Sequence, residues 1–275
     1  MKIPKLIVQV AITGSDTTPS QSPYIPITTD EIVEECYRCR QAGASMVHLH
    51  IRDPKDGKPV GRMDLWEETL KRVKRKCDDL IIGVTTGGFY GATIDDRLDV
   101  IRNFEPEIAS FTPESVTICH THIIPRVQEW KYDWEKEYLE STASATFSNT
   151  WEEIELFAKT MREHGTKPEC EFFGSSGLYN TRELWRSGIL EAPLAIQCVF
   201  GARGGTGAYP SEVVHFQTEA VRHLGPDTFN WSVIGVGYPR QYTLGALAIS
   251  MMGHVRVGME DNIYVRLKGS DKVNY

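Results

Sequence analysis

The sequence predicts an α/β fold, a (β/α)8 TIM barrel, and three observations favour it. Apolar, β-branched runs alternate with amphipathic helical segments along the chain, a pattern typical of parallel sheets covered by helices. Eight such runs occur, the number that closes a barrel. No G-x-G-x-x-G follows the first run, which disfavours the competing open, doubly wound sheet. The 275 residues suit a barrel, because barrels of ~250 residues form single domains.

Each strand is predicted where apolar residues cluster between turn-forming residues and helix caps. The eight predicted strands are Leu6–Thr13, Met46–Ile51, Leu80–Thr85, Ile108–Phe111, Glu169–Phe173, Leu194–Phe200, Trp231–Val236 and His254–Val257. The predicted helices cover 29–43, 64–77, 94–102, 149–164, a segment that includes 182–187, then 211–222 and 242–252. Their starts follow capping residues; Thr29, for example, precedes two acids and Gly43 ends that helix.

Two features depart from a regular barrel. The segment from about 112 to 150, after the fourth strand, is rich in His, Trp, Tyr and Ser and is expected to be an irregular insertion that acts as a lid, a binding loop or an oligomer contact. Strand eight ends near Val257, and the segment from Tyr264 to Tyr275 is too short for an eighth helix. We therefore expect a missing or truncated last helix, with the face between strands eight and one open or covered by the insertion or a neighbouring subunit. No linker divides the chain, so residues 1–275 are predicted to form one barrel domain.

Composition excludes several classes of protein. A net charge of −7 argues against nucleic-acid binding and against binding to anionic membranes. No apolar run is long enough to span a membrane, and no cleavable signal is evident. The six cysteines are scattered, and Cys36 and Cys39 form a C-x-x-C inside a helical pattern without a second pair nearby. We expect reduced thiols, a cytoplasmic location and a homo-oligomer that acts on small molecules.

Three residues at predicted strand ends form a candidate metal site. His48 and His50 project from the same side of the second strand, because strand side chains alternate. Glu260 follows the eighth strand, which lies one strand away from the second in a closed barrel. Two His and one carboxylate are typical of catalytic zinc, although iron and manganese accept the same ligands. A second H-x-H, His120 and His122, lies in the insertion with no strand to hold it, and His254, at the start of strand eight, is predicted to be packed in the core.

Other polar residues are expected around this centre, because catalytic residues of barrels gather at the carboxyl ends of the strands. The candidates for substrate binding are Asp16, Thr85, Thr86, Ser110 and Glu171. Arg256 and Asp261 form a candidate ion pair that would aim the carboxylate as a general base. Two glycine-rich loops follow strands six and seven, and their backbone amides are candidates for phosphate binding, with Arg203 and Arg240 beside them. These loops contain Gly204 and Gly205 in one case and Gly235 and Gly237 in the other.

Several motifs together resemble the β-keto acid cleavage enzymes, of which the 3-keto-5-aminohexanoate cleavage enzyme is the type. They are ITGSD, AGASMVHLHIRDPKDGKP, VTTGG, QCVFGARGG and GHVRVGMEDNIY, between about Ile7 and Tyr264. The resemblance implies a zinc-dependent barrel that condenses a β-keto acid with acetyl-CoA and cleaves the adduct to acetoacetate and a new CoA ester. It implies His48, His50 and Glu260 as zinc ligands, Asp261 as the base oriented by Arg256, and Gly204 and Gly205 near CoA.

The resemblance also implies a polar substrate site in which residue types are exchanged. Thr85 stands where the family commonly has serine, Ser110 where it has threonine, and Asp16 where it has glutamate, while Glu171 matches a site glutamate. Two other functions remain open. One is a metal-dependent barrel hydrolase or lyase that does not use CoA, although the amidohydrolase pattern would place H-x-H on strand one. The other is a metal or ligand-binding protein without activity, for which Arg256 and Asp261 would be superfluous.

Overall fold

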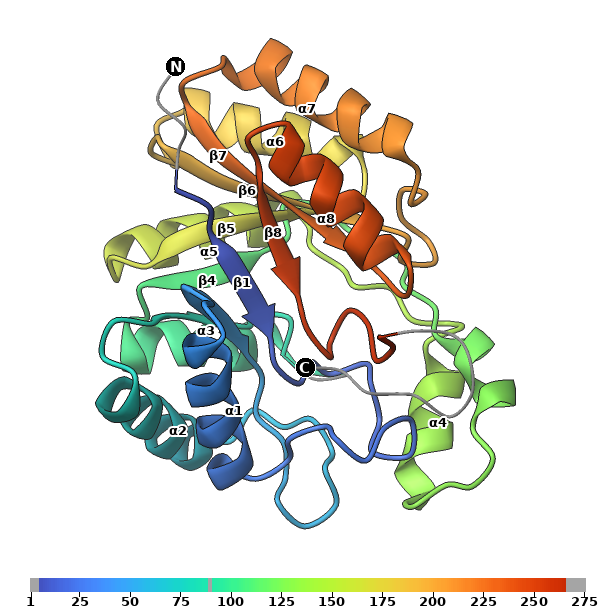
Figure 1. Cartoon of the computed structure of the whole chain (residues 1–275). Helices are drawn as coiled ribbons and strands as arrows, with labels where there is room; N and C mark the ends of the chain where they lie inside the picture. The colour runs from blue at the N-terminus through green and yellow to red at the C-terminus, as the bar shows by residue number, and fades with distance from the viewer. Residues whose placement is uncertain (1–4, 89–90, 266–275) are drawn as a thin grey trace.

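A computed structural model describes residues 5–88 and 91–265 and contains a closed barrel of eight parallel strands, ordered from β1 to β8 (Figure 1). The strands are β1 (Val8–Ala11), β2 (Met46–Leu49), β3 (Ile81–Val84), β4 (Ile108–Phe111), β5 (Lys167–Phe172), β6 (Leu194–Phe200), β7 (Phe229–Gly235) and β8 (His254–Val257). All eight lie within two residues of their predicted starts, and the barrel prediction is confirmed.

Seven helices follow the first seven strands and cover the outside of the described barrel. They are α1 (Thr29–Gln41), α2 (Met63–Lys76), α3 (Ile94–Phe104), α5 (Trp151–Glu163), α6 (Ser175–Arg186), α7 (Pro210–Leu224) and α8 (Arg240–Ser250). Thr28, not Thr29, caps α1, where it forms a capping box with Glu31. Tyr209, not Ser211, precedes α7, which Pro210 opens, as its fixed backbone angle favours. Both starts differ from the prediction by one or two residues.

The apolar core lies between the helices and the outside of the barrel, whereas part of the interior is polar. Cys36 and Cys39 of α1 belong to that core as free thiols, as predicted. Inside the barrel, Gln9 donates to Glu169 at 2.9 Å, and Gln197 donates to Gln9 at 2.7 Å and to Ser232 at 2.8 Å. These side chains form a hydrogen-bonded layer beneath the carboxyl ends of the strands. Among the described residues, no helix is long and apolar enough to cross a membrane.

The insertion after β4 is more regular than predicted. It contains a short 3-10 helix, η1 (Thr121–Arg126), and a helix, α4 (Asp133–Ser141). Figure 1 shows α4 beyond the end of the barrel to which the arrows of β1 and β8 point. The buried Glu135 of α4 ties this helix to the β1–α1 loop, because it accepts hydrogen bonds from the Ser20 amide at 2.8 Å and the Ser20 hydroxyl at 2.7 Å. The prediction of an irregular segment is therefore wrong for these residues.

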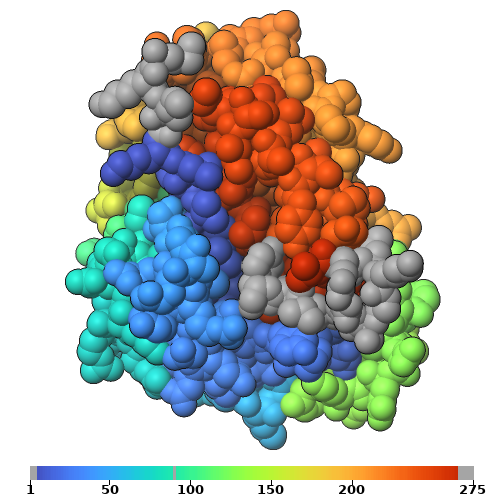
Figure 2. Space-filling model, in the orientation of Figure 1, coloured from blue at the N-terminus to red at the C-terminus, as the bar shows by residue number. Residues whose placement is uncertain are grey.

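The first and last strands close the barrel directly. Val8 pairs with Val255, and the Ile7 amide donates to Nδ1 of His254 at 3.2 Å. His254 is thus packed and hydrogen-bonded, as predicted, with 8% exposure. Figure 2 shows the face on which these N-terminal and C-terminal segments meet. In the part of the chain from 258 to 265 a turn follows β8 and no helix forms, while the expected missing or truncated last helix concerns residues 266–275, which lie outside the described residues.

Candidate active site

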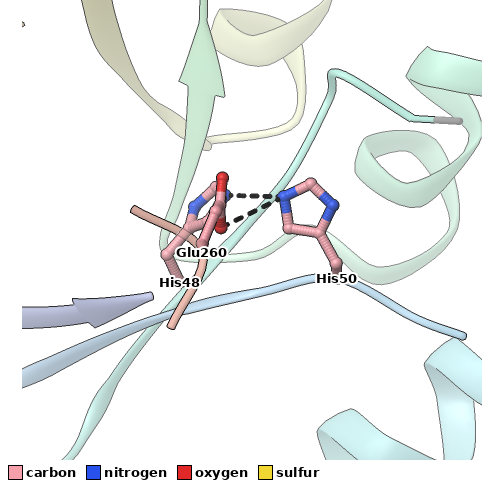
Figure 3. A group of neighbouring side chains, drawn as sticks. All are labelled: His48, His50 and Glu260. Atoms are coloured by element: carbon pink, nitrogen blue, oxygen red, sulfur yellow. Dashed lines mark hydrogen bonds and ion pairs between the residues drawn. The ribbon is translucent and has the colours of Figure 1, made fainter. Parts of the chain in front are cut away.

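His48, His50 and Glu260 converge at the carboxyl end of the barrel (Figure 3). His48 lies on β2, His50 directly follows it, and Glu260 lies in the turn after β8. The Nε2 atoms of the two imidazoles are 3.1 Å apart, and Glu260 Oε2 is 3.7 Å from His48 Nε2 and 3.5 Å from His50 Nε2. The structure therefore brings the three predicted ligands together.

This trio fits a divalent metal ion. Donor atoms held at about 2.0–2.2 Å by one tetrahedral ion lie roughly 3.3–3.6 Å apart, close to the separations above. Glu260 Oε2 is buried and has no hydrogen-bond partner among the described residues, an arrangement that costs free energy unless something binds it. Burial, together with Arg256, holds the pKa of His48 well below its usual value, so this imidazole is neutral, the form that ligates metals.

Two glycines allow Glu260 to reach the histidines across the β1–β8 junction. Gly258 has φ +130°, and a Cβ there would collide with the carbonyl oxygen of Ala11; Gly14 has φ +64°, and a Cβ there would collide with the Glu260 side chain. Only glycine adopts these angles without strain and leaves this room. The turn is then fixed by hydrogen bonds, including one from the Glu260 amide to Ala11 O at 3.3 Å.

Arg256 on β8 binds three carboxylates, those of Glu171, Glu260 and Asp261. We call these four residues together the charged floor. Its guanidinium lies 3.0 Å from Glu171, 2.7 Å from Glu260, and 2.9 Å and 3.1 Å from the two oxygens of Asp261. The contact with Asp261 is bidentate, a geometry that fixes orientation as well as distance. The predicted pair between Arg256 and Asp261 is present, and Glu171 and Glu260 join it.

The floor perturbs the protonation of its members. Burial raises the pKa of Asp261 to about 6 despite the opposing effect of Arg256. Burial likewise raises the pKa of Glu171 to about 8. Burial alone would raise the pKa of Glu260 as well, but Arg256 and the two histidines outweigh it and hold this pKa well below its usual value. Neighbouring carboxyls with pKa values driven apart are typical of sites that move protons.

Arg52 is a structural support of the site that the sequence pattern did not reveal. It is 1% exposed, and it donates to the Thr13 hydroxyl and to the backbone oxygens of Thr13, Gly14, Thr17 and Gly57, at 2.6–3.0 Å. Arg52 therefore shapes the β1–α1 loop, which carries Gly14 and Asp16. The available signal was the alternation of His48, His50 and Arg52, which places three polar side chains on one side of an otherwise buried strand.

A pocket of about 700 Å³ opens beside the trio. Its lining includes His48, His50 and Glu260, and the predicted site residues Asp16, Thr85, Ser110 and Glu171. From the insertion it includes Ile118, His120, Tyr138, Thr142 and residues 144–148. Thr86 does not line it, because its hydroxyl donates to the Ser110 carbonyl at 2.7 Å and its amide to the Ser110 hydroxyl at 3.0 Å. Thr86 thus holds Ser110 in position.

A larger cavity of about 1320 Å³ adjoins the pocket. The two share Asp16, Ile118, His120, Glu171, Phe173 and Glu260 in their linings. Four arginines, Arg126, Arg203, Arg240 and Arg256, line the larger cavity, and so do Asp261 and Gly237. The other glycines singled out in the sequence make close backbone contacts instead: Gly204 lies against Thr117, Gly205 against Phe173, and Gly235 against Arg240.

Asp16 already has an imidazole partner. Nε2 of His120, from the insertion, lies 3.1 Å from an Asp16 oxygen, and the Tyr138 hydroxyl is 3.3 Å from the other. Burial would lower the pKa of His120, but Asp16 outweighs it and raises this pKa above its usual value. The predicted second H-x-H is therefore split, since His120 pairs with a carboxylate while His122 lines the larger cavity.

Glu169 and Glu171 lie with His48 in a second group whose potential ligand atoms are within 4.8 Å of one another. Both carboxylates already have partners, however. Glu169 accepts a hydrogen bond from Gln9, and Glu171 binds Arg256. Glu260 binds Arg256 through Oε1, and its Oε2, which faces the two imidazoles, accepts no hydrogen bond from the described residues, so the trio is the better candidate metal site.

Comparison with known proteins gives a consistent result. The family model described as beta-keto acid cleavage enzyme matches residues 5–275. The 3,5-dioxohexanoate:acetyl-CoA acetone transferase of Paraburkholderia graminis is 36% identical over 261 residues, which cover 95% of this chain and 83% of that protein. The 3-keto-5-aminohexanoate cleavage enzyme of Acetoanaerobium sticklandii is 33% identical over 261 residues, covering 95% of this chain and 84% of that protein.

Solved structures share the fold. The binary complex of ObcA with oxaloacetate superposes with a TM-score of 0.64 at 22% identity. The match covers 88% of this chain and 58% of that chain, so the present chain spans little more than half of the ObcA chain. At this identity the likeness supports the barrel architecture alone.

Proposed function

The chain belongs to the β-keto acid cleavage enzyme family, whose members include acetyl-CoA transferases. On that premise we propose that its activity depends on zinc. In this proposal the protein condenses a β-keto acid with acetyl-CoA and cleaves the adduct to acetoacetate and a new acyl-CoA. The observation that carries the proposal is the convergence of His48, His50 and Glu260 beside the charged floor, at the mouth of a barrel. A CoA-independent hydrolase has no need of the second, larger cavity.

His48, His50 and Glu260 would hold the metal. When bound, a zinc ion supplies Lewis acidity at the keto oxygen of the substrate and so acidifies the adjacent carbon. The set of two imidazoles and one carboxylate, with room beside it for a substrate oxygen, suits this role.

Asp261 is proposed to act as the general base. It takes a proton from the carbon between the carboxylate and the ketone, and that carbon then attacks the acetyl-CoA carbonyl and displaces the CoA thiolate. The thiolate next attacks the original ketone, and the carbon–carbon bond breaks to give the new acyl-CoA and the acetoacetate carbanion. Asp261 returns its proton to that carbanion, so protons and bonds balance over the cycle. The bidentate contact with Arg256 keeps the carboxylate aimed throughout.

One hydroxyl directly after β3 and one on β4 would stabilise charge on oxygen in this proposal. Thr85 and Ser110 line the pocket that also holds the metal ligands. Donors fixed in advance around a developing oxyanion lower the barrier because they need not reorganise. Thr86 contributes indirectly through its two hydrogen bonds to Ser110. Asp16 and Glu171 complete the proposed substrate-binding set.

The larger cavity is the proposed acetyl-CoA site. It meets the smaller pocket at Glu171 and Glu260, so a thioester in one reaches a keto acid in the other. Arg126, Arg203 and Arg240 supply the cationic groups that phosphates require. Gly237 lines this cavity, and Gly204, Gly205 and Gly235 shape the two loops around it.

The test combines metal analysis with product detection. Purified protein is analysed for zinc, iron and manganese, and the metal-loaded protein is incubated with acetyl-CoA and a panel of β-keto acids while CoA esters are followed by mass spectrometry. We expect one zinc per chain and acetyl-CoA-dependent loss of a keto acid. His48→Ala should lose both the metal and roughly 10³-fold in turnover, as expected when several kcal/mol of metal stabilisation disappear.

Two outcomes would contradict the proposal. Turnover that does not require acetyl-CoA would favour a hydrolase or lyase of another kind. A fully loaded metal site that turns over no member of the panel would favour a ligand-binding protein. His164→Ala, on an exposed face away from the site, is the matched control and should retain metal and activity.

A further inference from the structure

We propose that the keto acid carries an uncharged, polar group at the end remote from its carboxylate, such as a carbonyl or a hydroxyl. This inference rests on the proposed function and deepens it, because it names the class of substrate. It depends on the part of the 700 Å³ pocket that the insertion lines. We call this part the pocket wall: Ile118, His120, Tyr138, Thr142 and residues 144–148.

The metal ligands His48, His50 and Glu260, together with Glu171 of the charged floor, line one side of the pocket. A β-keto acid that presents its carboxylate and ketone to them must extend its remaining chain away from the floor. The insertion supplies the surface in that direction, since α4 lies beyond the ends of the strands (Figure 1). The chemistry of the wall therefore selects the remote group.

Two carboxylates line this side of the pocket, Asp16 and Glu153, and both already have partners. Glu153 accepts a hydrogen bond from the Thr150 amide at 2.6 Å at the start of α5. Asp16 contacts His120 at 3.1 Å and the Tyr138 hydroxyl at 3.3 Å. His120 is itself held in place, because its amide donates to the Thr142 hydroxyl at 2.9 Å, and that hydroxyl donates to Leu139 O at 2.6 Å. A cationic substrate would have to displace a fixed imidazole to reach Asp16, so the pair disfavours a remote ammonium group.

The basic group at the pocket is also engaged. Arg97 donates through Nε to Thr86 O at 2.8 Å and through Nη1 to Asn149 at 2.9 Å. Its guanidinium lies 4.5 Å from the Phe147 ring centre and 4.6 Å from that of Phe157, so two aromatic faces stabilise the cation. A remote carboxylate would therefore meet a guanidinium that is already held by the protein.

The rest of the wall offers neutral hydrogen-bonding groups. Ser144, Thr146 and Ser148 line the pocket and are exposed to it, and each carries a hydroxyl that both donates and accepts. A carbonyl or hydroxyl on the substrate satisfies such groups without a counter-ion. A charged group bound at these three hydroxyls would lose hydration without meeting an opposite charge at them, which is unfavourable.

The first experiment compares three β-keto acids with the wild-type, metal-loaded protein and acetyl-CoA: 3,5-dioxohexanoate, 3-oxoadipate and 5-amino-3-oxohexanoate. We expect kcat/KM for 3,5-dioxohexanoate, whose remote group is uncharged, to exceed kcat/KM for each of the other two acids by roughly tenfold or more. A tenfold ratio corresponds to about 1.4 kcal/mol of discrimination. A charged acid that is cleaved best overturns the inference while the proposed function stands. Turnover of none of the acids refutes the proposed function instead, and calorimetric binding of the same acids without acetyl-CoA then decides the preference for charge.

The second experiment removes the counter-ion of Asp16. His120→Asn should raise kcat/KM for 5-amino-3-oxohexanoate relative to 3,5-dioxohexanoate by roughly tenfold, because the substitution frees the Asp16 carboxylate to bind the ammonium group of the substrate. Lys136→Gln, which removes a positive charge from an exposed position on α4, is the matched control and should leave the ratio unchanged. An unchanged ratio in His120→Asn overturns the role of the pair.

A third variant protects the test if His120→Asn fails to fold. Asp16→Asn removes the same pair from its other side. The inference expects the amino acid to remain a poor substrate of Asp16→Asn, with no selective loss. A selective fall of kcat/KM for the amino acid in this variant would show that Asp16 is its receptor and would overturn the inference.

Discussion

The charged floor and the pocket wall both border the 700 Å³ pocket, the floor through Glu171 and Glu260, but they are built differently. Arg256, Glu171, Glu260 and Asp261 of the floor lie on or directly after strands of a closed barrel and hold one another by short ion contacts. The wall comes from an insertion that reaches the barrel through a few side chains, notably Glu135. In the proposed reaction, bonds change beside the charges of the floor, whereas the wall pairs Asp16 with His120 where the substrate only has to fit. The proposed function thus assigns reaction chemistry and substrate choice to separate parts of the chain.

The largest expected effect concerns the floor. Asp261→Asn should lower kcat by roughly 10²–10⁴-fold, the usual contribution of a positioned general base, while the metal content stays the same. Steady-state kinetics with parallel metal analysis measures both. Asp227→Asn, at an exposed turn, is the control and should behave like wild type. Near-normal turnover in Asp261→Asn would contradict the proposal that the charged floor takes part in the reaction while the pocket wall selects the substrate.

The next effect concerns the support shared by floor and wall. Arg52→Met should reduce the free energy of unfolding by about 3 kcal/mol or more, because several buried backbone oxygens lose their donor at once. Urea denaturation followed by circular dichroism gives the value. Arg62→Met, a change of the same kind at an exposed arginine, should stay close to wild type. Equal stabilities of the two variants would show that the β1–α1 loop does not need Arg52.

A smaller effect concerns the local stability of the insertion, which should differ from that of the barrel. Glu135→Gln weakens the contact between α4 and Ser20 and should cost about 1–3 kcal/mol, the penalty of unsatisfied buried groups. Hydrogen exchange should become faster over 131–141 and remain unchanged in the strands, because the insertion opens as a local unit. Glu137→Gln, exposed on the same helix, is the control. Faster exchange throughout the barrel would mean that wall and floor unfold together.

The smallest effect is the pH dependence of the pair between Asp16 and His120. Asp16 raises the pKa of His120 in the folded protein, so the stability from this group is fully present below the ordinary histidine value and is lost as the pH rises through the raised one. The pKa of Asp16 is lowered, despite burial, mainly by His120. The stability that Asp16 contributes is therefore fully present above the ordinary pKa of aspartate and is lost as the pH falls through the lowered pKa. An NMR titration should give His120 a midpoint above 6.5 that falls in Asp16→Asn. A midpoint unchanged by that substitution would contradict the pair.

The sequence predicted the barrel and the floor well, because both depend on local patterns. Strand runs and caps are short-range signals, and H-x-H together with the residues after strand eight place ligands by simple alternation. The wall depends on contacts between distant residues, such as His120 with Asp16 and Glu135 with Ser20, and no local pattern encodes them. Arg52 was visible in the motif with the histidines, but its five acceptors come from loops whose shape exists only in the folded chain. For the same reason the sequence could not distinguish Thr85, which lines the pocket, from Thr86, which does not.

The turn after β8, which Gly258 and Gly14 make possible, also has a consequence for how the barrel closes. It joins an early strand to the last one through Glu260, across a junction with only three paired positions between β1 and β8, compared with seven between β6 and β7. An ion held by His48, His50 and Glu260 would stabilise this junction, because linking residues far apart in the chain removes much of the conformational freedom of the open form. Chelation would then loosen the β1–β8 junction first and leave the β5–β7 region paired.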